Sequence, residues 1–240
     1  MSNFTTETYT YKKVAGHSIK ADIIRRPCHV QQPAIIWIHG GALIAGARQM
    51  INPAHRDLYL DAGYTIIAID YRLAPETKLP EIVKDLKDAI QWVRNNHTIL
   101  RIHLKHLTII GHSAGGYLAL LSGYVVTPPP SAIISFYGYG DITSDWYSKP
   151  DAFYLTLPCI SKREAYNVIG IDIISNDGGS SNRAPFYRYC RQQGLWPNKV
   201  VGQDLRTNPQ FFIPYNPVQS STPHQFYVST YTIITWRSGY

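Results

Sequence analysis

The chain has 240 residues, of which 45% are hydrophobic and 16% charged, which excludes a disordered or fibrous protein and suits one domain with its own core. The formal net charge is +7, but the Lys and Arg residues are scattered along the sequence. A nucleic-acid-binding surface requires clustered basic residues, so we expect no nucleic-acid partner and attribute the charge to solubility or a mild attraction of acidic substrates.

Four short apolar runs in the first 140 residues predict β-strands that are buried on both faces of a parallel sheet. A helix is predicted between the second and third runs, where PEIVKDLKDAIQWVRNN carries one apolar stripe and opens with Pro and Glu. Alternating strands and helices predict a doubly wound, mostly parallel α/β sheet. The runs are residues 34–39 (AIIWIH), 65–70 (TIIAID), 107–111 (LTIIG) and 132–137 (AIISFY), and the helix is 80–96.

The composition changes after residue 140. Residues 141–217 are rich in Tyr, Pro, Asn and Gly, and a helix is predicted mainly at 162–168. Long structured insertions in compact folds are often functional, so we interpret this segment as a lid inserted over the carboxyl edge of the sheet, within a single domain 1–240.

A strand-turn-helix motif surrounds Ser113. The sequence Gly111-His112-Ser113-Ala114-Gly115 fits G-x-S-x-G, follows an apolar strand and precedes the apolar run 117–121. Small residues permit the sharp turn that exposes a nucleophilic serine at the top of a sheet. The alternative is a chance glycine turn that contains a serine, but the context favours the nucleophile. We predict Ser113 as the catalytic residue, with the amide of Ala114 in the oxyanion hole.

A glycine turn follows the first predicted strand. It begins His39-Gly40-Gly41-Ala42, with Gly46 a few residues later. Glycines let the backbone approach a substrate, so the amides of Gly41 and Ala42 are predicted oxyanion donors. His39 and Gly40 are predicted to support this loop. The alternative is a structural glycine loop without a catalytic role.

Asp70 and Arg72 follow the second predicted strand in the sequence DYRLAPE. Charged residues at the end of a strand suit a catalytic role, but hydrogen bonds and an ion pair that support the neighbouring loops are the better interpretation.

Together, HGGALIAG, DYRLAPE and GHSAGG resemble the esterase/lipase branch of the α/β-hydrolases, which includes hormone-sensitive-lipase-like carboxylesterases and acetyl or feruloyl esterases. The resemblance covers residues 35–137, and the segments WYSKPDAFY and YRYCRQQGLWP add a weaker match to the lid of a fungal subgroup. It implies a serine hydrolase with no cofactor or metal, acting on small or medium carboxylic esters.

The second half of the chain departs from the pattern of this family, in which an acid and then a His follow the nucleophile. His224 is the only His after Ser113, and residues 205–240 contain no Asp or Glu. His224 as base with Asp177 or Asp204 as acid would need an unusual topology. The last strands of the fold are therefore predicted to be missing.

The atypical tail 224–240, HQFYVSTYTIITWRSGY, suggests a shifted reading frame. With permitted codons, the same bases read one position later can encode TNSMYPPTLLLHGDQDT, which contains the expected strand and an H-G-x-x-D segment. The hypothesis is a frameshifted or truncated gene product, and genomic and transcript reads across residues 221–240 test it.

Three functions stay open at this point: an active serine esterase, a catalytically inactive remnant of one, or an amidase or peptidase of the same fold. A remnant lacking strands would expose a sheet edge and should melt at low temperature. Aromatic residues of the lid suggest an apolar pocket or the core of the lid itself; they are Trp146, Tyr147, Phe153, Tyr154 and Trp196.

Cys28, Cys159 and Cys190 are an odd number at wide spacing, which fits neither a disulfide framework nor a zinc site. The N-terminal sequence MSNFTTETYTYKKV has no apolar region of a signal peptide, and no apolar run reaches bilayer length. We therefore expect a cytoplasmic location, no transmembrane segment and a small-molecule ester substrate. The sequence does not indicate an oligomeric state.

Overall fold

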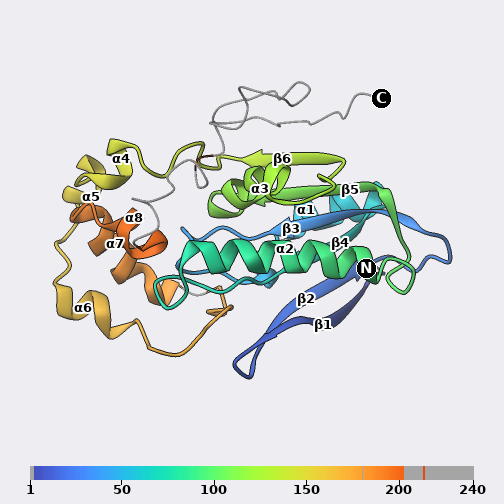
Figure 1. Cartoon of the computed structure of the whole chain (residues 1–240), viewed down its shortest axis with the longest axis horizontal. Coiled ribbons are helices and arrows are strands. Elements are labelled where there is room, and N and C mark those ends of the chain that lie inside the picture. The colour runs from blue at the N-terminus through green and yellow to red at the C-terminus, as the bar shows by residue number, and fades with distance from the viewer. Residues whose placement is uncertain (1–2, 180, 203–212, 214–240) are drawn as a thin grey trace.

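A computed structural model describes residues 3–179, 181–202 and 213 (Figure 1). Its centre is a six-stranded sheet in the order β1-β2-β4-β3-β5-β6. Strands β4, β3, β5 and β6 are parallel, and β1 and β2 pair antiparallel at one edge. The bounds are β1 Thr5–Val14, β2 His17–Arg25, β3 Gln32–Ile38, β4 Thr65–Ile69, β5 Ile102–His112 and β6 Ala132–Phe136.

The four parallel strands are those predicted from apolar runs, which confirms the mostly parallel α/β fold. The β1-β2 hairpin was not predicted. Its first strand alternates between exposed and partly buried residues, because one face of this edge strand is in water. A search for continuous apolar runs does not find such a strand.

Both faces of the parallel part of the sheet are buried. In β3, Ile36 and Ile38 belong to the core beneath α2 (Leu79–Asn95) and α3 (Ala114–Val125), whereas Ile35 and Trp37 belong to a second core beneath α1 (Pro53–Asp61). Helix α2 buries the predicted apolar stripe completely. The helices therefore cover opposite faces, as in a doubly wound sheet.

Short helices follow β6 and gather beyond one end of the sheet (Figure 1). We call residues 141–179 and 181–202 the cap segment; they make up most of the described part of the predicted lid. Helix α6 begins with a capping box between Ser161 and Glu164. The helices are α4 Asp145–Ser148, α5 Ala152–Leu155, α6 Lys162–Asn167, α7 Ala184–Gln192 and α8 Trp196–Val201, and two 3-10 turns are η1 Arg48–Met50 and η2 Ser181–Arg183.

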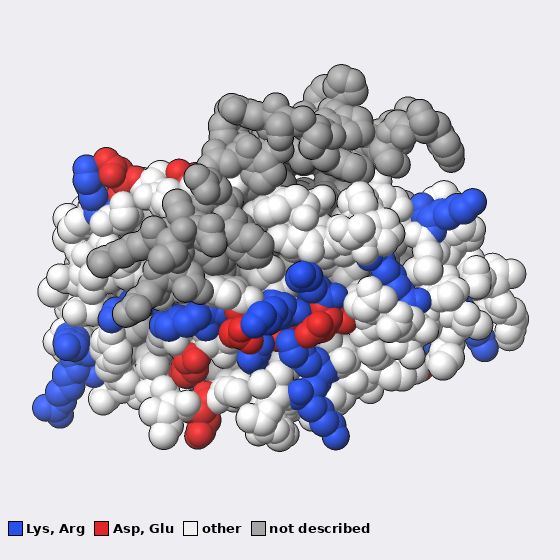
Figure 2. All heavy atoms as spheres, viewed as in Figure 1, with Lys and Arg blue, Asp and Glu red and all other residues white. Residues whose placement is uncertain are grey.

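The sheet ends at β6 within the described residues, and the tail with His224 lies outside them. No helix in the described ranges is long and apolar enough to cross a membrane. On the face in Figure 2, basic side chains lie in small groups separated by uncharged surface, and the central group is interspersed with acidic side chains.

Candidate active site

Ser113 stands between the end of β5 and the start of α3, as the sequence motif predicts. Its backbone has φ 54° and ψ −117°, a conformation that residues with a Cβ rarely adopt. The turn is held because the amide of Ser113 donates to the carbonyl of Phe136 (2.9 Å) and its carbonyl accepts from the amide of Tyr117 (3.0 Å). A sharp turn of this kind places the serine at the carboxyl end of the sheet.

Glycines around this turn allow backbone segments to touch. A Cβ on Gly40 would lie 2.9 Å from the carbonyl oxygen of His112 and 3.3 Å from the Cβ of Ser113. A Cβ on Gly111 would overlap the carbonyl of Gly115. The loop after β3 therefore lies directly against the serine, which is the proximity that an oxyanion hole requires.

The loop from Gly40 to Gly46, which we call the oxyanion loop, has unusual backbone angles. Gly41 has φ 109°, Ala42 56° and Leu43 62°. Ala42 therefore holds a positive φ although it carries a Cβ, a conformation that glycine adopts at little cost. The carbonyl of Ala42 accepts from Nε1 of Trp196 (3.0 Å), and that of Leu43 accepts from the amide of Ala74 (2.8 Å).

Hydrogen bonds also fix the peptide groups before Gly41 and Ala42. The carbonyl of Gly40 accepts from Nδ1 of His39 (2.7 Å), and that of Gly41 accepts from the amides of Ile44 and Ala45 (both 2.9 Å). In a trans peptide the N–H points opposite to the C=O. These bonds therefore set the directions of the Gly41 and Ala42 amides.

His39 is completely buried and stacks on Tyr71 at 4.2 Å between ring centroids. Burial lowers the pKa of His39 from 6.5 to about 4, so the ring is neutral at pH 7 and its Nδ1 hydrogen is available to the carbonyl of Gly40. A Cβ on Gly46 would overlap this ring, so His39 and Gly46 together shape the loop.

Asp177 supports the far end of the loop, and Asp70 holds Arg48, which follows the loop in sequence. The amide and guanidinium of Arg48 donate to Asp70 (2.9 and 2.5 Å), and Asn176 Nδ2 donates at 3.0 Å. Burial raises the pKa of Asp70, and the hydrogen bonds and charge of Arg48 oppose that rise. Asp177 Oδ1 accepts from the amide of Gly46 (3.0 Å), so a cap-segment residue contacts the loop directly.

Arg72 does not pair with Asp70. Its guanidinium donates to Asp85 of α2 (Nε···Oδ2 2.7 Å, Nη2···Oδ1 2.8 Å). Its side chain therefore supports the segment between β4 and α2.

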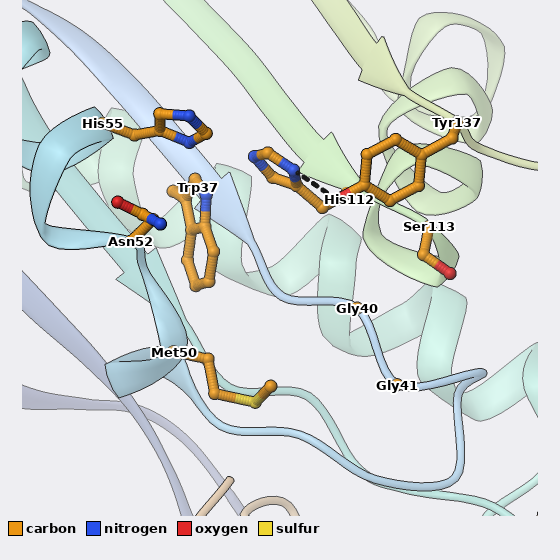
Figure 3. A pocket seen from close by; sticks show the side chains of 9 residues that line it. All are labelled: Trp37, Gly40, Gly41, Met50, Asn52, His55, His112, Ser113 and Tyr137. Atoms are coloured by element: carbon orange, nitrogen blue, oxygen red, sulfur yellow. Dashed lines mark hydrogen bonds between the residues drawn. The ribbon is translucent and has the colours of Figure 1, made fainter. Parts of the chain in front are cut away.

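Two pockets meet at Ser113 and Gly41. One has a volume of about 260 Å³ (Figure 3) and the other about 370 Å³. The first is lined also by Trp37, Gly40, Met50, Asn52, His55, His112 and Tyr137, and the second by Ala42, Ile44, Ala45, Tyr139, Tyr154, Arg183, Ala184 and Tyr187. A serine between two pockets has room for a substituent on each side of an attacked carbonyl.

The hydroxyl of Ser113 lies 3.2 Å from that of Tyr139, which is its hydrogen-bond partner among the described residues. Burial raises the pKa of Tyr139, so the phenol keeps its proton at neutral pH and cannot serve as a general base. It acts as a hydrogen-bonding neighbour of the serine.

His112 lies next to Ser113 in sequence but is directed toward His55, away from the hydroxyl of Ser113 (Figure 3). Its ring stacks with His55 (5.7 Å between centroids) and Phe136 (4.7 Å), and Nδ1 is 3.0 Å from the hydroxyl of Tyr137. Burial, with a smaller effect of His55, lowers the pKa of His112 to about 4. The ring lines the first pocket and does not contact the serine oxygen.

The structure brings together most of the residues predicted from sequence. Ser113, Gly40, Gly41 and Ala42 meet at one place, His39, Asp70 and Asp177 lie behind the loop, and His224 and Asp204 lie outside the described residues. Sequence reasoning missed Asn52, His55, Tyr139, Arg183 and Tyr187, which no motif marks.

The predicted lid aromatics divide into three groups. Tyr147 and Trp196 are buried, Tyr154 lines the larger pocket, and Trp146 and Phe153 are 62% and 65% exposed. The described residues contain no cluster of three or more His, Cys, Asp or Glu that could hold a metal ion.

Solved structures with this fold include an α/β-hydrolase superfamily protein from Enterococcus faecalis, 27% identical with a TM-score of 0.65 over 83% of this chain and 70% of that one. A protein of unknown function from Staphylococcus aureus has a TM-score of 0.69 at 22% identity, over 80% of this chain and 68% of that one. A bacterial heroin esterase has a TM-score of 0.58 at 17% identity, over 91% of this chain and 62% of that one. These likenesses confirm the α/β-hydrolase fold.

Curated relatives are far longer than this chain. The non-reducing polyketide synthase Preu3 of Preussia isomera is 32% identical over 151 residues, and ausA of Aspergillus calidoustus is 34% identical over 165 residues. These matches cover 58% and 62% of the chain but only 6% and 7% of the relatives.

The BD-FAE family model matches residues 22–145, from β2 through the oxyanion loop and Ser113 to the start of the cap segment. This match covers more than half of the chain and includes every motif of the site. The chain belongs to the BD-FAE family of esterase-like α/β-hydrolases.

Proposed function

We propose that the chain is a serine carboxylic-ester hydrolase for small or medium esters, with Ser113 as nucleophile and the amides of Gly41, Ala42 and Ala114 as the oxyanion hole. The observation that carries this proposal is the strained turn at Ser113 directly against Gly40. Ala114 is the first residue of α3, so its amide has no acceptor within the helix.

In this mechanism a general base takes the proton of Ser113 Oγ, which attacks the ester carbonyl and forms a tetrahedral intermediate whose oxyanion accepts hydrogen bonds from the three amides. The base returns the proton to the departing alcohol, and an acyl group remains on Oγ. Water, deprotonated by the same base, then attacks the acyl carbonyl and releases the acid and the free serine hydroxyl. One lost oxyanion donor typically costs about 3 kcal/mol of transition-state stabilisation. The loop bonds described above hold two of these donors before substrate arrives.

Two groups besides the serine are required, a general base and an acid that orients it. We propose that Asp177 supports the oxyanion loop, because its carboxylate accepts from Gly46. His224 stays the candidate base and Asp204 a candidate acid; both lie outside the described residues. The frameshift hypothesis for residues 224–240 stays a proposal beside them.

Covalent labelling with an alkyl fluorophosphonate tests the nucleophile, since the probe phosphonylates activated serines. Mass spectrometry should place the adduct on Ser113, and Ser113→Ala should not be labelled. A folded wild-type chain that takes no adduct would favour the catalytically inactive remnant. Labelling that persists in His224→Ala would remove His224 as base.

Substrate panels distinguish the remaining alternatives. Hydrolysis of p-nitrophenyl acetate and butyrate without release of p-nitroaniline from matched anilides supports an esterase over an amidase or peptidase. The names of the curated relatives add polyketide-derived acyl esters as substrates to test.

A further inference from the structure

Ala42 depends on a bond from outside its own loop. Its φ of 56° is unfavourable for a residue with a Cβ, and Leu43 follows at 62°. Hydrogen bonds within the loop, from the amides of Ile44 and Ala45 to the Gly41 carbonyl, fix the peptide group before Ala42. The peptide group after Ala42 is held by Trp196, whose Nε1 donates to the Ala42 carbonyl (3.0 Å). Without that donor, the peptide group after Ala42 loses a hydrogen bond that holds Ala42 and Leu43 at positive φ, and the oxyanion loop is less firmly placed beside Ser113.

Trp196 comes from the cap segment, as the first residue of α8, and its side chain is fully buried. The edge of one ring meets the face of the other where Trp196 contacts Tyr139 (5.4 Å between centroids, 73° between planes). Both rings also contact Tyr147 (4.9 and 5.1 Å). One aromatic cluster therefore reaches both parts of the site.

The polar ends of the two rings point to the two catalytic elements. The indole nitrogen of Trp196 binds the oxyanion loop at Ala42, and the hydroxyl of Tyr139 lies 3.2 Å from Ser113 Oγ. We propose that Tyr139 and Trp196 form one positioning unit that holds the serine hydroxyl and the oxyanion loop in a fixed relation. This inference rests on the proposed role of Ser113.

The competing explanation is that the two rings serve only as the apolar core of the cap segment. Tyr139→Phe and Trp196→Phe separate these roles, because the first removes only the O–H, and the second keeps an aromatic ring while it removes the N–H together with part of the indole. The melting temperature reports the packing that Trp196→Phe loses. Trp146→Phe is the control for the same change at an exposed position, since Trp146 lies in the same segment and is 62% exposed.

The experiment measures the maximal rate and the dissociation constant of fluorophosphonate labelling at Ser113, with melting temperatures. We expect Trp196→Phe to lower the maximal rate about ten-fold, as one lost buried hydrogen bond implies, with the dissociation constant unchanged. Tyr139→Phe should lower it as well, and the double variant should lose less than the product of the two losses, because contacting residues couple. Trp146→Phe should match the wild type.

Three results would overturn the proposal. A wild-type maximal rate in Trp196→Phe would show that the indole N–H does not position the loop. If the maximal rate falls only together with a lower melting temperature and a weaker dissociation constant, the two rings have a packing role only. Absence of labelling in the wild type would overturn the proposed role of Ser113 and this inference together, whereas the first two results leave Ser113 as nucleophile.

Discussion

Gly115 lies against Ile38 so closely that a Cβ on Gly115 would overlap the carbonyl oxygen of Ile38. Helix α3, which follows the serine, and strand β3, which leads into the oxyanion loop, therefore meet backbone to backbone. The two halves of the candidate site are held together at this contact.

Gly115→Ala should destabilise the protein by about 2 kcal/mol or more, because backbone atoms must move apart. Gly123→Ala in the same helix is the control: its Cβ would lie 3.0 Å from Cδ1 of Ile133, the flexible end of a side chain, and the gain in helix propensity is about 1 kcal/mol. Urea denaturation compares the two variants. Equal stabilities would mean that the contact at Ile38 is not tight.

Ser113→Gly should be more stable than Ser113→Ala, although neither variant carries the hydroxyl of Ser113. The conformation at Ser113 costs a residue with a Cβ on the order of 1–3 kcal/mol, part of which is offset by the greater freedom of glycine in the unfolded chain. We expect a difference of about 1 kcal/mol in the free energy of unfolding. Identical unfolding curves would show that this turn carries no strain.

The stability should fall as the pH is lowered from about 6.5 to about 4. In this range the unfolded chain binds protons at His39 and His112, whereas burial lowers both folded-state pKa values to about 4. The unfolded state then holds more protons, and complete titration of one such His costs about 3 kcal/mol.

His39→Asn should flatten this dependence, because the amide of Asn can still donate to the carbonyl of Gly40 but does not titrate. His29→Asn is the control, since His29 is exposed. Chemical denaturation at several pH values measures how the free energy of unfolding changes with pH. If His39→Asn shows the same dependence as the wild type, the lowered pKa is not that of His39.

Asp177→Asn distinguishes a loop support from a triad acid. The amide oxygen of Asn can still accept from Gly46, so we expect the labelling rate of Ser113 to fall less than about ten-fold. Loss of a triad acid typically lowers the rate about 10⁴-fold. Labelling kinetics with fluorophosphonate decide between the two, and a loss of the larger size would assign Asp177 to the triad.

The sequence predicted the parallel strands and the place of Ser113 because both depend on local patterns, apolar runs and small residues at a turn. It could not predict contacts between distant segments. Tyr139 lies 26 positions from Ser113, and Trp196 lies 154 positions from Ala42. The β1-β2 hairpin was also missed, since an edge strand with one wet face lacks a continuous apolar run.

The two pockets that share Ser113 suggest that the two parts of an ester would bind on opposite sides of the serine. An ester held across the serine would place its acyl part in one chamber and its alcohol part in the other. In the proposed mechanism, water would enter through the pocket that the departing alcohol leaves empty, while the acyl group stays bound in the other. Enlarging one chamber should therefore alter the choice of alcohol or of acid, but not both.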